Sequence, residues 1–254
     1  MGYGALIATF IAITLEVLAG FGSMVTAGLL VTVLPGNQAT LEGLYQALQA
    51  PGQAMDPAAV LDALLTPLTI LAAALFLAVL TPLIEETSKS LGVWLAGTAR
   101  PLGRARAFAL GVMAGAGFSL TEAVFNGAAQ LPAAWASLVV LRAVTVLIHG
   151  LATGLLALGW YEVLHRRPWR FAAYAVAGIG LHGFWNGLGG LSALAGLGVL
   201  EESAPGLHVG IALLSSAMLV GTLVVATLVL AWLTTTLVSE TRRQAMPADG
   251  ARAD

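Results

Sequence analysis

Six long apolar runs constrain the fold of this chain more than any other feature of its sequence. Each is long enough to cross a bilayer as a helix, which takes about 20 residues, and they lie near residues 5–34, 68–97, 107–128, 133–159, 171–200 and 208–238. Charged residues make up only 9% of the 254 residues. This composition excludes a soluble globular enzyme, a disordered chain and a nucleic-acid-binding protein, which would need a basic face. We therefore expect an all-α, polytopic membrane helical bundle with about six transmembrane helices.

The positions of the basic residues predict the orientation of this bundle. Nine of the eleven Lys and Arg residues lie in three segments, 100–106, 166–170 and 242–252. The loops that alternate with these segments contain no Lys or Arg. Because cytoplasmic loops carry the excess of basic residues, we expect both termini in the cytoplasm. The chain has ten Arg to one Lys and is rich in Ala and Gly, which favours a bacterial source and hence the cytoplasmic (inner) membrane.

We expect one transmembrane domain over residues 1–240 and a polar cytoplasmic tail over 241–254. The outer loop 35–67 is the one sizeable segment between spans. Apolar residues recur in it at helical spacing, and Asp56-Pro57 is typical of a helix start. The loop is therefore predicted to form short amphipathic helices.

Seven polar residues inside the apolar runs are candidates for a functional site, because ionisable groups at membrane depth are unfavourable unless they serve one. They are Glu85, Glu86, Lys89, Glu122, His149, His182 and Asn186. With a rise of about 1.5 Å per residue, the titratable groups on four successive spans lie about 15–22 Å from the cytoplasmic ends of their helices. They therefore share one level near the bilayer centre. Glu16 in the first span has no partner at a matching spacing and is expected to be incidental.

Spacing within each span places these residues on common helix faces. Glu85 and Lys89 are four residues apart, as are His182 and Asn186. Small residues with Gly-x-x-x-Gly spacing, which lets helices approach closely, flank the candidates at 111 and 115, at 150 and 154, and at 183 and 187. An ion pair of Lys89 with a neighbouring glutamate that only fixes the helix packing remains an alternative interpretation.

These residues, in this order, resemble the PrsW family of intramembrane proteases, which belongs to a superfamily with the CAAX prenyl endopeptidases and bacteriocin-processing membrane proteins. The resemblance rests on four motifs: Glu85-Glu86-Thr-Ser-Lys89, Gly115-Ala-Gly-Phe-Ser-Leu-Thr-Glu122, Arg142 with His149, and His182-Gly-Phe-Trp-Asn186. One departure is Ala123, which stands where the family usually has Asn. The resemblance implies an intramembrane endopeptidase.

Peptide hydrolysis in a membrane needs a base to activate water and donors for the oxyanion. Glu86 or Glu85 is the best candidate base, with Glu86 preferred, and Lys89 would keep one of the pair ionised and oriented. His182 and Asn186 share a face and are the candidate oxyanion donors, the role that the resemblance to the CAAX endopeptidases implies. In those relatives a histidine that helps to hold the water stands at the position of Glu122, so Glu122 is expected to do the same. His149 would complete the water site.

The sequence leaves the metal dependence open. Two carboxylates and two imidazoles, from Glu86, Glu122, His149 and His182, form a candidate Zn²⁺ site. The chain has no His-Glu-x-x-His motif, which is the strong sequence signature of a zinc protease. The family is often labelled metalloprotease, whereas its mechanistic relatives resemble metal-free glutamate proteases. A zinc mechanism and a glutamate-water mechanism are therefore both retained.

Two other functional classes are compatible with the pattern. A proton- or ion-coupled transporter also gathers Glu, Lys and His at the midplane, although repeated halves are not evident here. A non-catalytic scaffold or immunity protein would be expected to have lost a motif position, and all four are present. For a protease, the resemblance implies a membrane-tethered substrate, such as an anti-sigma factor or another single-pass protein in the bilayer.

Overall fold

The computed structural model describes residues 2–33, 67–128, 132–196 and 206–245, and every regular element within these ranges is a helix. In chain order they are η1 (Tyr3–Ala8), α1 (Thr9–Val33), α4 (Pro67–Leu75), η2 (Phe76–Leu80), α5 (Thr81–Ala99), α6 (Arg104–Ala128), α7 (Pro132–Leu164), α8 (Pro168–Gly196) and α9 (Leu207–Ala245). The segments η1 and η2 are π-helical turns that continue directly into α1 and α5. The amphipathic helices predicted for residues 35–67 fall almost wholly outside the described residues.

The predicted class, a helical membrane bundle, is confirmed. Within the described ranges, five helical segments are long and apolar enough to cross a membrane, namely Leu6–Ser23, Thr69–Ala99, Arg104–Phe125, Ala143–Leu164 and Leu207–Ala245. The predicted fifth span corresponds to α8, which has 29 residues but is not among these five. It includes the polar His182 and Asn186, and it packs against α7 and α9. Helix α9 continues past the expected domain boundary at residue 240, as far as Ala245.

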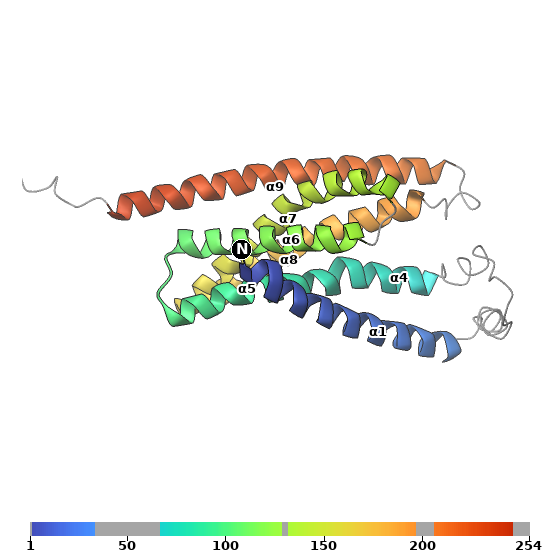
Figure 1. Ribbon diagram of the computed structural model, residues 1–254, viewed down its shortest axis with the longest axis horizontal. Coiled ribbons are helices and arrows are strands. Elements are labelled where there is room, and N and C mark those ends of the chain that lie inside the picture. Colours follow the sequence, from blue (N-terminus) through green and yellow to red (C-terminus); the bar gives the residue numbers. More distant parts are fainter. Residues whose placement is uncertain (1, 34–66, 129–131, 197–205, 246–254) are drawn as a thin grey trace, which may run out of the picture.

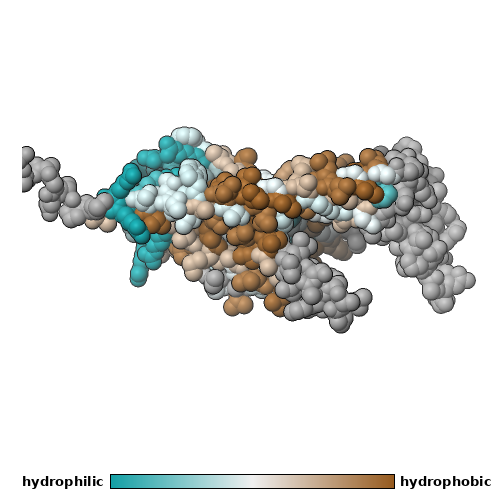
Figure 2. All heavy atoms as spheres, turned by 90° about the horizontal axis from the view of Figure 1, so that it is seen from above, coloured by the Kyte–Doolittle hydropathy of each residue, from teal (hydrophilic) through white to brown (hydrophobic). Residues whose placement is uncertain are grey.

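Helix α6 runs opposite to α5, and α8 runs opposite to α7 (Figure 1). The connections α5–α6 and α7–α8 and the C-terminal end of α9 lie at the same end. These are the segments that contain the clustered arginines. Figure 2 shows hydrophilic residues gathered at this end and mainly apolar residues along the visible flank of the bundle. The bundle is therefore polar at its arginine-bearing end and apolar where lipid would surround it.

Helix α7 is the central helix, because α5, α6, α8 and α9 all pack against it. Glycines allow two of these contacts. A Cβ added at Gly115 of α6 would collide with the backbone carbonyl of His149, and one added at Gly178 of α8 would lie 2.6 Å from the Ala152 oxygen. The close approach of α6 at the predicted Gly111–Gly115 pair brings the backbones of α6 and α7 together around His149.

The π-helical turn η2 immediately precedes the Glu-Glu-x-x-Lys motif of α5. Two of its carbonyl groups contact α8: the Ala78 oxygen lies against the Cα of Gly183, and the Leu77 oxygen accepts a hydrogen bond of 3.3 Å from Asn186 Nδ2. Single π turns are frequent at functional sites, since they interrupt the regular backbone hydrogen bonding. Through these contacts the turn places the first motif, on α5, beside the last motif, on α8.

Candidate active site

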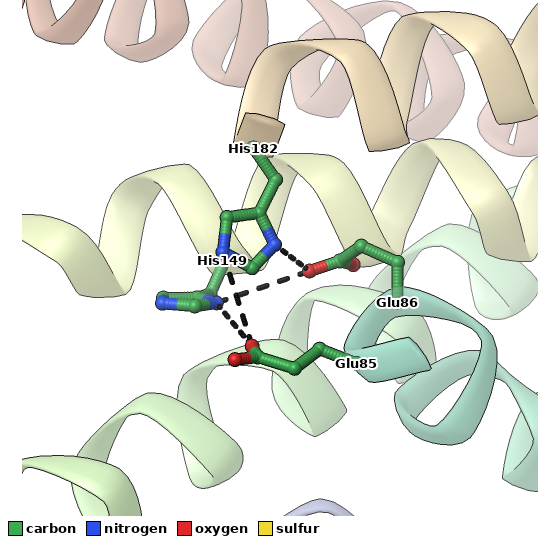
Figure 3. Close-up of side chains that lie close together, drawn as sticks. All are labelled: Glu85, Glu86, His149 and His182. Carbon is green, nitrogen blue, oxygen red and sulfur yellow. Dashed lines mark hydrogen bonds and ion pairs between the residues drawn. The ribbon is translucent and has the colours of Figure 1, made fainter. Parts of the chain in front are cut away.

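Five ionisable side chains converge in the middle of the bundle. Glu85, Glu86 and Lys89 come from α5, His149 from α7 and His182 from α8, and each residue is at most 4% exposed. Figure 3 shows the two carboxylates and the two imidazole rings facing one another, with ring centroids 4.5 Å apart. The structure thus brings together five of the seven residues that the sequence singled out.

The Lys89 ammonium lies between three acceptors. Its Nζ is 2.6 Å from Glu85 Oε2, 2.8 Å from Glu86 Oε1 and 2.7 Å from His149 Nδ1, and it lies 4.0 Å from the centroid of the Phe118 ring. An ammonium group has three N–H donors and no acceptor. His149 Nδ1 must therefore accept, so the proton of the neutral His149 ring is on Nε2.

Glu86 is the more completely bound of the two glutamates. Its Oε1 accepts hydrogen bonds from Lys89 and from His182 Nδ1, the latter at 2.8 Å. Its Oε2 accepts a 2.6 Å hydrogen bond from the hydroxyl of Thr153. Thr153 was not among the predicted residues, although its position one turn after His149 places it on the same face of α7. Three donors hold this fully buried carboxylate in place.

Glu85 has fewer close partners. Its Oε2 accepts the hydrogen bond from Lys89, and the nearest nitrogens of His149 and His182 are each 3.8 Å from that oxygen. The carboxyl of Glu16 lies close enough to Glu85 for the two groups to interact electrostatically. The expectation that Glu16 is incidental did not anticipate this position, which arises because α1 packs against α5. Among the described residues, Glu16 Oε1 is buried without a hydrogen-bond partner.

The two remaining predicted residues lie beside the cluster. Glu122 Oε2 is 3.4 Å from His149 Nε2, the nitrogen that carries the proton, so Glu122 contacts the far side of that ring. Asn186 lies one turn beyond His182 and donates to the Leu77 carbonyl. The side chain of Arg142, from the third motif, is outside the described part of the chain.

The cluster has the donor types of a divalent metal site. Glu85, Glu86, His149 and His182 each offer one ligand atom, and these atoms all lie within 4.8 Å of one another. Two carboxylates and two imidazoles suit Zn²⁺. The set differs from the predicted one because Glu85 takes the place of Glu122. Glu122 has instead the position of the carboxylate that orients a metal-binding histidine through its other nitrogen.

Comparison with known proteins identifies the family. The model of the PrsW family intramembrane metalloproteases matches residues 1–214, a range that includes all four motifs and every residue of the cluster. No curated protein and no solved structure matches the chain. With more than four fifths of its length matched, the chain belongs to the PrsW family of intramembrane metalloproteases and is a multi-pass membrane peptidase.

Proposed function

We propose that this PrsW-family peptidase cleaves a peptide bond of a single-pass or membrane-tethered protein, such as an anti-sigma factor, in the bacterial cytoplasmic membrane. The observation that carries the proposal is the buried cluster of two glutamates, two histidines and one lysine within the bundle. The arginine-bearing end of the bundle supports an orientation with both termini in the cytoplasm.

In this proposal Glu85 is the general base that takes a proton from the attacking water. A carboxylate has about four acceptor positions, and Glu86 already accepts from Lys89, His182 and Thr153. Glu85 accepts one short hydrogen bond from a basic group, at 2.6 Å. It therefore retains more capacity to bind water and accept a proton. The sequence left both glutamates open with a preference for Glu86, and the contacts favour Glu85.

The other residues orient this base and stabilise the developing charge. Lys89 forms ion pairs with both buried carboxylates, and Glu86 fixes the His182 ring through Nδ1. The second N–H of Asn186 is the proposed donor to the oxyanion. His182 holds Glu86 through Nδ1–H, so it adds a second donor at Nε2 only as the imidazolium. Glu122 orients His149 through Nε2, and together they complete the water site.

Zinc is the ion that the donor set favours. If it is bound, Glu85, Glu86, His149 and His182 are the residues that would hold it. A bound divalent ion would act as a Lewis acid on the scissile carbonyl. The orientation of His149 by Glu122 and of His182 by Glu86 serves hydrolysis with or without the ion.

Quantitative membrane proteomics tests the proposed function. Strains carrying wild type, E85Q or the control E240Q are compared for full-length single-pass proteins and for their fragments. Glu240 is a partly exposed glutamate of α9, paired with Arg104 away from the cluster. We expect E85Q alone to accumulate one or a few uncleaved single-pass proteins. Equal protein and fragment levels in all three strains would contradict the proposal, and a transport assay would then test the alternative class.

A further inference from the structure

The Lys89 ammonium lies among the candidate metal ligands, where a metal ion would bind. Three of the four candidate ligands hold Nζ directly, at 2.6 Å from Glu85, 2.8 Å from Glu86 and 2.7 Å from His149. Zinc lies about 2.0–2.2 Å from carboxylate oxygens and imidazole nitrogens. The donors around the ammonium therefore form a slightly expanded version of a zinc coordination sphere. The two cations cannot occupy this position together.

The charge of the two glutamates also favours one cation at this position, either the ammonium or a metal ion. Two buried carboxylates carry two negative charges, and the ammonium compensates one of them at hydrogen-bonding distance. Removing a charged partner from a buried pair leaves a strongly unfavourable uncompensated charge. A divalent ion could replace the ammonium, since it supplies the missing charge to the same oxygens. Lys89 is enclosed by the Phe118 ring on another side and is itself 0% exposed.

We propose that the Lys89 ammonium is the resident cation of this four-donor site, and that a divalent metal binds only after Nζ has left it. Lys89 thereby lowers the apparent metal affinity of the protein through direct competition. This inference goes beyond the proposed function, because it concerns occupancy of the site whatever reaction the site performs. Its test does not measure proteolysis.

The experiment measures Co²⁺ binding to the purified full-length protein in lipid nanodiscs. Visible absorption reports coordination by the imidazole nitrogens, and elemental analysis gives the metal content after dialysis against a chelator and reloading. Lys89→Met removes the ammonium but keeps an unbranched side chain. Lys89→Gln is a second neutral variant, whose amide still donates to the glutamates and supports folding. In the double variant Lys89→Met/His182→Ala one ligand is also removed.

We expect wild type to bind Co²⁺ weakly and to hold less than one equivalent of the metal in the elemental analysis. Lys89→Met should bind one equivalent at least about 100-fold more tightly, beyond the 10–100-fold typical of residues outside the ligand shell. The double variant should lose that gain. Wild type that retains one equivalent, or binds as tightly as Lys89→Met, would overturn the proposal. If neither neutral variant folds, the wild-type protein alone provides the test. Binding of one equivalent of Co²⁺ by wild type would overturn the proposal, and the absence of a Co²⁺ absorption spectrum would support it.

Discussion

The hydrogen bond from Thr153 to Glu86 allows a sharp test of how the buried carboxylate is held. The donor and acceptor lie 2.6 Å apart, and both residues are 0% exposed. Thr153→Val replaces the hydroxyl by a methyl of similar size, so it creates little cavity but leaves one lone pair of Glu86 unbonded. A hydrogen bond to a charged group contributes about 1.5–3 kcal/mol. Interhelical hydrogen bonds in membranes average about 0.6 kcal/mol. We therefore expect a loss of about 1–3 kcal/mol of unfolding free energy.

The measurement is reversible unfolding in mixed micelles by titration with a denaturing detergent. Thr153→Ser is the matched control, because it keeps the hydroxyl and removes one methyl, which is worth about 0.8 kcal/mol of burial. Thr153→Val should be less stable than Thr153→Ser, although it is the more apolar variant. Equal or greater stability of Thr153→Val would refute the inference that this hydrogen bond holds Glu86.

Three further variants test neighbouring contacts. Gly115→Ala places a Cβ against the His149 carbonyl and should cost about 1–3 kcal/mol of stability. Gly150→Ala should be tolerated, because its new Cβ would lie 3.5 Å from the nearest atom, on Val112. Equal unfolding midpoints of the two variants would contradict the close packing of α6 on α7 at Gly115. Asn186→Ala should reduce kcat about 10²–10³-fold with little change in KM, as for loss of one oxyanion donor. If the variant lost stability but kept its kcat, Asn186 would serve only the hydrogen bond to Leu77, and the oxyanion role would be contradicted. Glu122→Ala should reduce activity about 10–100-fold. Glu122→Gln should recover part of it, because its amide oxygen can take the place of Oε2 beside His149 Nε2; identical rates for both variants would contradict that orienting role.

The fold was largely predictable, because apolar runs of bilayer length leave few alternatives to a helical bundle. The glycine spacing also predicted where α6 approaches α7, since Gly115 lies directly against the His149 backbone. The π-helical turn at Phe76–Leu80 was not predictable. It contains only apolar residues with no sequence signal, and its contacts with α8 exist only in the folded bundle.

The sequence predicted which helix faces carry the site residues, but not which of their atoms contact one another. Glu85 and Glu86 are adjacent, and both lie within four residues of Lys89, so spacing could not decide which one binds His182 and Thr153. Glu16 could not be placed because its contact with Glu85 depends on the packing of α1. The atom that each ring nitrogen faces is likewise a tertiary property. For that reason the sequence could name Glu122 only as a candidate metal ligand, and its position beside His149 Nε2 was not predictable.

Single-turnover cleavage by wild type, E85Q and E86Q tests the central claim most directly. Each is reconstituted in proteoliposomes with the single-pass protein that accumulates in the E85Q strain. If Glu85 activates the water, E85Q should bind this protein with unchanged affinity and cleave it at the background rate. E86Q, which still accepts hydrogen bonds through its amide oxygen, should retain slow cleavage. Cleavage by E85Q at a rate near that of wild type would contradict the account.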